Sequence, residues 1–186
     1  MYEDYEPREE LPRALLREVY DWVEAGMMAV VCVVLLFTFV VRLAGVEGDS
    51  MLPTLHHHDR LLITRLAMPA RQGDIVVVTK PTSRGEPLIK RVIATEGQMV
   101  YIDFSSQTVM VDGKKLEEPY IAEPTALRYD MEFPQKVPEG CVFIMGDNRN
   151  NSWDSRDWEV GMVDERYILG KVIYRVLPYD QMGKPS

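Results

Sequence analysis

The sequence predicts a mainly β domain with antiparallel or mixed sheets, preceded by one apolar N-terminal helix. Two observations carry this prediction. Residues 25–41 form a run of 17 residues without a charged side chain. From residue 59 onward, apolar residues fall in short runs rich in Val, Ile, Thr and Tyr, broken by turn residues, as strands do. The 186 residues suffice for one globular domain and an accessory segment.

The apolar run predicts a transmembrane anchor. Seventeen residues are at the short end of what crosses a bilayer, but apolar neighbours lengthen the run. These neighbours are Trp22, Val23, Leu43 and Ala44. A cleaved secretory signal and a buried core helix are the alternatives. Residues 1–24 hold three Arg against eight acidic residues, so the basic segment of a secretory signal is missing. We therefore expect a short segment at 1–24, an anchor helix at 25–44 and a folded domain at 45–186.

Charge and cysteine content exclude some classes of protein. The net charge is −8, divided as −4 up to residue 44 (4 basic, 8 acidic) and −4 after it (17 basic, 21 acidic). Neither part is basic, which argues against a nucleic-acid binder. Cys32 lies in the apolar run and Cys141 in a strand-like segment, so we expect two small buried side chains and no internal disulfide.

The domain after the anchor is expected to contain seven strands. Asp112-Gly113 predicts a two-residue hairpin turn after the fifth of them. Four prolines in residues 117–139 predict a long irregular excursion. The expected strands are 59–65, 74–79, 88–94, 98–103, 107–111, 141–145 and 170–176.

Ser50, in EGDSMLPTL at 47–55, is a candidate nucleophile, and a serine needs an adjacent base. The run His56-His57-His58 is one candidate base, although a solvated turn or weak metal binding explains it as well. A carboxylate is a second candidate. Lys90, in PLIKRVIA, is a third, because an ammonium group among apolar side chains loses its charge more readily than in water. The ordinary alternative for Lys90 is an exposed side chain on a polar strand face.

Residues 146–156, GDNRNNSWDSR, follow directly after the apolar strand CVFIM. Such a density of Asp, Asn, Ser and Arg predicts a network that satisfies its own donors and acceptors. Asn150 begins a glycosylation sequon, a match that is common by chance. A calcium loop at Asp147, Asn151 and Asp154 is a further alternative, but the glycine and terminal glutamate of such loops are missing.

These three segments, together with RQGDIVVV at 71–78, resemble the bacterial type I signal peptidases in order and spacing. The resemblance is greatest to the branch with a single N-terminal anchor, and it runs from about residue 27 to residue 177. It implies that Ser50 is the nucleophile, Lys90 the general base and Ser152 the group that orients the Lys90 amine. Supporting roles fall to Met51 and Pro53 in the nucleophile turn, Asp154 paired with Arg156, and Asp147 paired with Arg91.

Three positions depart from the family pattern. Some members carry a hydroxyl side chain two residues before the nucleophile, where this chain has Gly48, so the Ser50 backbone N–H remains as the first oxyanion donor. His58-Asp59 stands where the family has Gly-Asp. Residues 94–98, ATEGQ, replace the pattern G-x-P-G-D. The last two departures concern loop shapes and leave the serine and lysine untouched.

The resemblance implies a membrane-anchored serine endopeptidase that needs no metal or organic cofactor. Its partners would be preprotein signal peptides with small residues before the cut, bound as an added strand, together with membrane lipid and, as a candidate, the secretion translocon. Basic residues on the two sides of the anchor are nearly tied in number. The function favours a single-pass protein of the cell membrane with a cytoplasmic N-terminus and an extracytoplasmic catalytic domain. Ser50 lies nine residues past Val41, at most about 30 Å along the chain.

Two other readings remain. A self-cleaving repressor-type peptidase also uses a Ser–Lys pair, but it needs a DNA-binding helical domain where this chain has an apolar run. A non-enzymatic anchored β-domain, or an inactive paralogue, is the second alternative.

Overall fold

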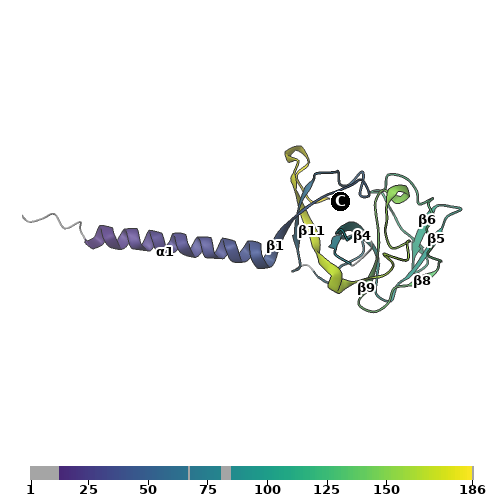
Figure 1. The fold of residues 1–186 in the computed structure, drawn as a ribbon, viewed down its shortest axis with the longest axis horizontal. Coiled ribbons are helices and arrows are strands. Elements are labelled where there is room, and N and C mark those ends of the chain that lie inside the picture. The colour runs from purple at the N-terminus through teal and green to yellow at the C-terminus, as the bar shows by residue number, and fades with distance from the viewer. Residues whose placement is uncertain (1–12, 67, 81–84, 186) are drawn as a thin grey trace, which may run out of the picture. The chain divides into compact units, whose positions relative to one another are not determined.

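The computed structural model describes residues 13–66, 68–80 and 85–185, and the chain divides into two compact units, Met1–Val40 and Val41–Ser186. The first unit contains α1 (Arg13–Leu35) and a π-helical turn at Leu36–Val40 (Figure 1). Within the described ranges, Leu15–Thr38 is the one helical span long and apolar enough to cross a bilayer, with a mean hydropathy of 1.8. None of this span is buried. An apolar helix without protein neighbours has the surface expected of a segment that faces lipid.

The helix ends earlier than the sequence predicted. We expected the anchor to extend through residue 44, but Val41–Gly45 form strand β1, which pairs antiparallel with β2 (Arg60–Thr64). Val41 lies opposite Thr64 and Gly45 opposite Arg60. Hydropathy reports composition only, so an apolar strand that directly follows a helix looks like its continuation. The folded unit therefore begins at Val41 rather than at residue 45.

The second unit consists of two antiparallel sheets. One sheet has the strand order β1-β2-β11-β3-β4-β9-β10, and the other has the order β7-β6-β5-β8. Figure 1 shows β5, β6 and β8 together, away from β1 and β11. The strands are β3 (Ile75–Val78), β4 (Leu88–Thr95), β5 (Met99–Asp103), β6 (Thr108–Val111), β7 (Lys114–Lys115), β8 (Gln135–Lys136), β9 (Cys141–Met145), β10 (Val163–Asp164) and β11 (Ile168–Leu177).

The predicted mainly β class is confirmed, and each of the seven expected strands is present. All strand pairings in the described parts of the chain are antiparallel, which decides between the antiparallel and mixed alternatives. The two-residue strands β8 and β10 were not predicted, because two residues are too few to show a period. Asp112 and Gly113 have φ of 52° and 75°, as the predicted hairpin turn between β6 and β7 requires.

The core explains why the central strands read as continuous apolar runs. Strands β4 and β9 contribute side chains to two clusters. Ile93 and Phe143 pack with residues of β5 and β6, between the two sheets. Val92 and Ile144 pack with β3 and β11 in the other cluster. A strand buried on both faces shows no apolar–polar alternation. Lys90 and Arg91 of β4 lie in such a strand and are themselves buried.

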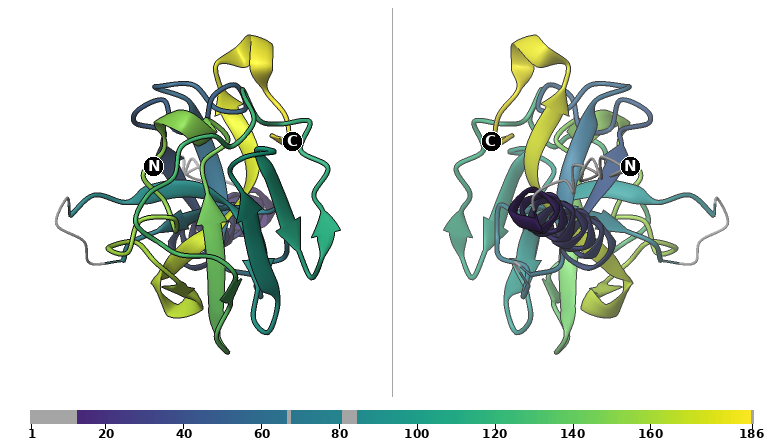
Figure 2. Two further views of the ribbon diagram at one scale, coloured as in Figure 1. Left: turned by 90° about the vertical axis from the view of Figure 1, so that its right-hand side faces the viewer. Right: turned by 90° about the vertical axis from the view of Figure 1, so that its left-hand side faces the viewer.

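Short helical turns and loops complete the unit. Among the residues that the structure describes, three 3₁₀ turns are present, at Arg149–Asn151, Glu165–Tyr167 and Tyr179–Gln181. After β11 the chain turns back, and Gly183 forms a bridge with Arg175 (Figure 2). Residues 117–134 carry no strand and follow an irregular path, as the prolines predicted.

Candidate active site

Ser50 lies in a turn that follows β1. The turn is closed by hydrogen bonds from Leu52 N to Asp49 O (3.2 Å) and from Leu55 N to Met51 O (2.9 Å). Met51 and Leu55 are buried in the cluster that contains Val46 and residues of β2 and β3. These apolar anchors hold the turn against the sheet and leave Ser50 half-buried at its edge.

Lys90 lies on β4, opposite Val76 of β3. Its Nζ lies 2.7 Å from Ser50 Oγ and donates to the Ile89 carbonyl oxygen at 3.0 Å. Only 3% of Lys90 is exposed. Burial disfavours the charged ammonium relative to the neutral amine, which is the form able to accept a proton. The structure therefore brings together the serine and the lysine, which are 40 residues apart in the sequence.

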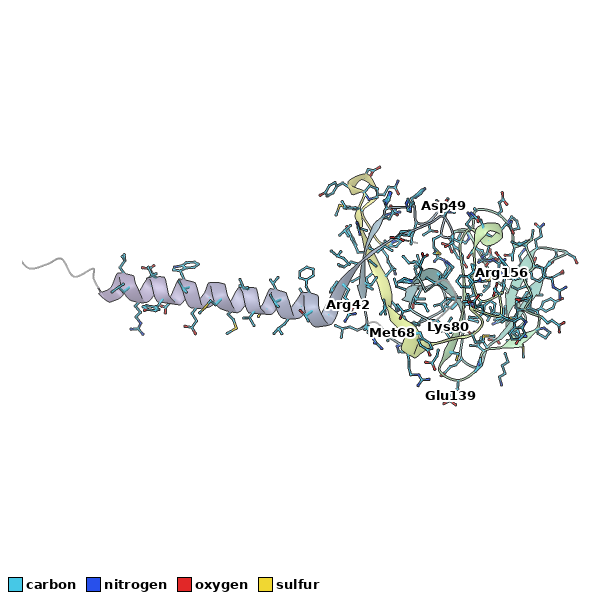
Figure 3. The ribbon with its side chains drawn as sticks, viewed as in Figure 1. Arg42, Asp49, Met68, Lys80, Glu139 and Arg156 are labelled. Carbon is cyan, nitrogen blue, oxygen red and sulfur yellow. The ribbon has the colours of Figure 1, made fainter. Side chains whose placement is uncertain are left out.

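Residues 146–156 form a loop whose charged side chains are buried. Asp154 and Arg156 have no exposed surface, and they form a forked pair in which Nε donates to Oδ1 and Nη2 to Oδ2, each at 2.9 Å. Burial alone would raise the pKa of Asp154, but the Arg156 guanidinium and the Gly146 N–H hold that pKa below its ordinary value. Figure 3 shows Arg156 among the packed side chains of the domain, in contrast to Glu139 at its periphery.

A second buried pair joins this loop to β4 and to the nucleophile turn. Arg91 donates to Asp147 Oδ1 at 2.8 Å and to Oδ2 at 2.7 Å. The Thr54 hydroxyl, four residues after Ser50, donates to the same carboxylate at 2.5 Å. Asn148 N donates to Ser50 O at 3.0 Å. Asp147 thus contacts the residue next to Lys90 and the turn that carries Ser50, so it can fix their separation. Asp147 and Asp154, which the sequence suggested as part of a calcium loop, both bind guanidinium groups through their carboxylates.

Ser152 lies close to the nucleophile turn, but among the described residues no hydrogen bond joins its Oγ to Lys90 as expected. Its side chain is buried, and Oγ makes no hydrogen bond with any residue that the structure describes. Gly146 lies between the two serines: a Cβ there would be 2.2 Å from Ser152 Oγ and 2.4 Å from Ser50 O. Ser152 is thus placed next to the nucleophile turn, and its role in orienting Lys90 stays a prediction.

A groove with a volume of about 900 Å³ lies next to Ser50 and Lys90. The walls come from β1 and the nucleophile turn, from the residues leading into β4, and from the end of the polar loop. Ser50, Lys90 and Ser152 all line it. Other lining residues include Ile63, Val77, Leu88, Tyr129, Trp153 and Leu169. A cleft of this size accommodates several residues of an extended peptide.

The histidine run is not part of the groove lining. His56, His57 and His58 are exposed, and His57 Nδ1 accepts a hydrogen bond from Gly48 N at 3.1 Å. His58 has a φ of 72°, in the left-handed region that favours glycine. The turn therefore keeps the backbone shape expected of Gly-Asp even though His58 stands in the glycine position. Asp59 follows and accepts hydrogen bonds from His56 N (3.0 Å) and Arg175 (3.1 Å).

Sequence reasoning missed two residues that support the loop. Arg149 is fully buried and donates to Gly146 O, to the Thr125 hydroxyl and to Glu118 at 3.0, 2.9 and 2.5 Å. Its place in the polar segment after a buried strand was a usable signal. Tyr129, in the irregular excursion, donates to Ser152 O at 2.7 Å. No local pattern in the sequence indicates that contact.

Comparison with known proteins identifies the family of this chain. Residues 19–177 match the family model of signal peptidase, peptidase S26. The chain is 39% identical over 168 residues to a probable signal peptidase I-1 of Synechocystis, covering 85% of this chain and 82% of that protein. It is 34% identical over 176 residues to a signal peptidase I of Bacillus licheniformis, covering 89% and 92%. A crystal structure of a signal peptidase I from Enterococcus faecalis aligns with a TM-score of 0.44 and 29% identity, over 56% of this chain and 97% of that one. Because the family match spans most of the sequence, this chain belongs to the signal peptidase family, peptidase S26.

Proposed function

We propose that this chain is a membrane-anchored serine endopeptidase that removes signal peptides from secreted preproteins, with Ser50 as nucleophile and Lys90 as general base. The observation that carries the proposal is the 2.7 Å separation of Lys90 Nζ and Ser50 Oγ at the floor of a groove. The relatives named signal peptidase I support the substrate class.

Acylation follows from this pair. The neutral Lys90 amine accepts the Ser50 hydroxyl proton while Oγ attacks the scissile carbonyl carbon. The tetrahedral intermediate carries its negative charge on the former carbonyl oxygen, where the Ser50 backbone N–H is the proposed donor. As the C–N bond breaks, the Lys90 ammonium returns the proton to the leaving amine, which is the new N-terminus of the mature protein.

Deacylation uses the same base. The signal peptide is now held as an ester on Ser50 Oγ, and Lys90 is again neutral. A water molecule gives a proton to Nζ and attacks the ester carbonyl. Collapse of the second intermediate returns that proton to Ser50 Oγ and releases the signal peptide with a free carboxylate. No metal or organic cofactor takes part in these steps.

The apolar helix supports the proposal of a membrane anchor. A signal peptide presents its cleavage site just beyond a hydrophobic segment, and the proposed nucleophile follows the span Leu15–Thr38 by 12 residues. We propose a cytoplasmic N-terminus and an extracytoplasmic catalytic unit. The substrate binds in the groove as an extended strand with small residues before the cut.

Cleavage of a labelled preprotein by the full chain in detergent tests the proposal. Ser50→Ala and Lys90→Ala should each abolish cleavage while thermal unfolding of both variants remains cooperative. The matched controls Ser105→Ala and Lys115→Ala change exposed residues far along the chain and should cleave as wild type does. If Lys90→Ala still cleaves the preprotein, another group is the general base. A wild-type protein that cleaves nothing would favour the non-enzymatic alternative.

The pH profile gives an independent test of the base. Because Lys90 must be neutral to accept a proton, the rate should rise with pH along an acid limb and level off once the amine is deprotonated. A rate that stays constant down to pH 5 would contradict a lysine base.

A further inference from the structure

The irregular excursion at 117–134 is bound to the polar loop along much of its length. The Asn150 side-chain oxygen accepts hydrogen bonds from Ala126 N and Leu127 N, each at 3.0 Å. Arg156 donates to Leu127 O at 3.0 Å, and Met131 N donates to Arg156 O at 3.0 Å. The excursion therefore lies against the segment that carries Ser152, rather than forming a detached surface loop.

Tyr129 is the residue of the excursion at 117–134 that lines the groove containing Ser50 and Lys90. Its hydroxyl donates to Ser152 O at 2.7 Å, and its ring lies 4.9 Å from the Arg156 guanidinium carbon. The side chain is half-buried and lines the groove that contains Ser50 and Lys90. One side chain thus contacts the Ser152 backbone, the buried Arg156 and the substrate groove.

We propose that Tyr129 is a positioning residue that fixes the Ser152 peptide and thereby the Ser152 hydroxyl beside Lys90. This inference rests on the proposed function of Ser152 and adds the residue through which the excursion acts. Within the described chain the Ser152 Oγ forms no hydrogen bond with Lys90, and the Ser152 side chain packs closely against Gly146. The Tyr129 hydroxyl binds the Ser152 carbonyl oxygen and so holds the peptide that carries this side chain.

Tyr129→Phe separates this role from simple packing. Phenylalanine keeps the ring against Arg156 and the groove wall, and it removes the hydroxyl that donates to Ser152 O. We expect kcat to fall roughly fivefold, the effect of one lost neutral hydrogen bond, with KM unchanged. Tyr101→Phe on β5 is the matched control, since its ring is 40% exposed and far from the loop in the sequence. It should leave both constants unchanged.

A double-mutant cycle with Ser152→Ala tests whether Tyr129 acts through Ser152. Single-turnover cleavage with excess full-length enzyme keeps slow variants measurable. If the proposal holds, Tyr129→Phe has no further effect once Ser152 is alanine, and both single variants shift the acid limb of the pH profile in the same direction. Additive losses, a change in KM alone or an unchanged pH profile would overturn it.

The outcomes also separate this inference from the proposed function. Cleavage that depends on Ser50 and Lys90 but ignores Tyr129→Phe overturns only the role of Tyr129. No effect of Ser152→Ala removes the orienting role of Ser152 and this inference with it, while the Ser–Lys pair stands. A wild-type chain without cleavage removes the proposed function itself. Thermal unfolding of each variant shows whether a loss of rate reflects a loss of folded protein, in which case the positioning role is rejected.

Discussion

Two Asp-x-Arg segments of this chain form the same ion pair in opposite surroundings. In Asp154–Arg156 the Nε and Nη2 atoms donate to the two carboxylate oxygens at 2.9 and 2.9 Å, and in Asp164–Arg166 they do so at 2.9 and 2.7 Å. The first pair is fully buried, whereas 87% of the Arg166 side chain is exposed. The spacing permits this forked geometry but does not impose it, since Asp147 and Arg149 have the same spacing and pair with Arg91 and Glu118 instead. The surrounding fold decides how much such a pair contributes to stability.

The largest expected difference between the pairs is in stability. Asp154→Asn leaves the Arg156 charge buried without its partner, so we expect the free energy of unfolding to fall by about 3–5 kcal/mol. Asp164→Asn is the matched control and should lower the unfolding temperature much less, because water solvates Arg166. Thermal and denaturant unfolding of both variants in detergent measures the difference. Equal losses in the two variants would mean that burial is not the deciding factor.

The buried loop at 146–156 also borders the proposed catalytic groups, so a change in its position should reduce cleavage. Gly146→Ala places a Cβ within 2.4 Å of both Ser152 Oγ and Ser50 O, so the loop and the nucleophile turn must move apart. We expect preprotein cleavage to fall about 100-fold, as displacements near 1 Å can do. Gly26→Ala is the control, since nothing lies within 4 Å of a Cβ at that position. Unchanged cleavage by Gly146→Ala would show that the site tolerates a looser loop.

The two ion pairs should also differ in how acid and salt change the free energy of unfolding. The pKa of Asp154 is lowered in the folded protein, and that of Asp164 is lowered to about 2 by its hydrogen bonds with Arg166. A lowered folded pKa adds stability that is present above the unfolded pKa, near 4, and is lost as pH falls through the folded pKa. The free energy of unfolding should therefore fall as pH drops below about 4.

High salt then separates the two contributions to this acid sensitivity. Salt screens the exposed Asp164 pair and hardly affects the buried Asp154 pair. Unfolding measured from pH 5 downward at low and high NaCl tests this. Asp164→Asn should remove only a salt-sensitive part of the slope, and Asp154→Asn a part that persists in high salt. A slope in wild type that high salt abolishes completely would contradict the assignment.

The smallest effect is expected for a neutral, exposed contact. His57 Nδ1 accepts from Gly48 N, and His57→Gln can retain an acceptor there. We expect kcat/KM to change less than about threefold. The preprotein assay measures it beside Lys90→Ala. A tenfold or greater loss of kcat/KM would indicate that the histidine run takes part in catalysis.

The strands and the polar loop could be predicted because their signals are local. Short runs rich in β-branched residues predicted seven strands. The polar segment GDNRNNSWDSR after CVFIM predicted a network whose hydrogen-bond donors and acceptors bind one another. The sequence could also indicate that Ser50 and Lys90 belong together, although only through a family resemblance. Their contact depends on β4 lying beside β3, which in turn packs against the turn through Ile75 and Val77.

The remaining features are set by long-range packing. The end of the helix at Val40 depends on the pairing of β1 with β2, which begins 20 residues later. Tyr129 contacts Ser152, which lies 23 residues further along the chain and beyond β9, and Tyr129 itself lies in an irregular segment without a periodic pattern. The segments Asp154–Arg156 and Asp164–Arg166 look equivalent in the sequence, because the spacing of an ion pair does not show whether the pair will be buried.

The place of β11 in the large sheet has a consequence for biosynthesis. This strand lies between β2 and β3 although it is the last to be made, and Asp147 and Asn148 contact the nucleophile turn from more than 90 residues further along the chain. At about 5–20 residues per second, a ribosome needs on the order of ten seconds to go from Ser50 to the end of β11. Lys90 follows Ser50 by 40 residues and is made early in that interval, but the strand that joins β2 to β3 is made last. Under the proposed function, we therefore expect no cleavage activity until β11 has paired with both strands.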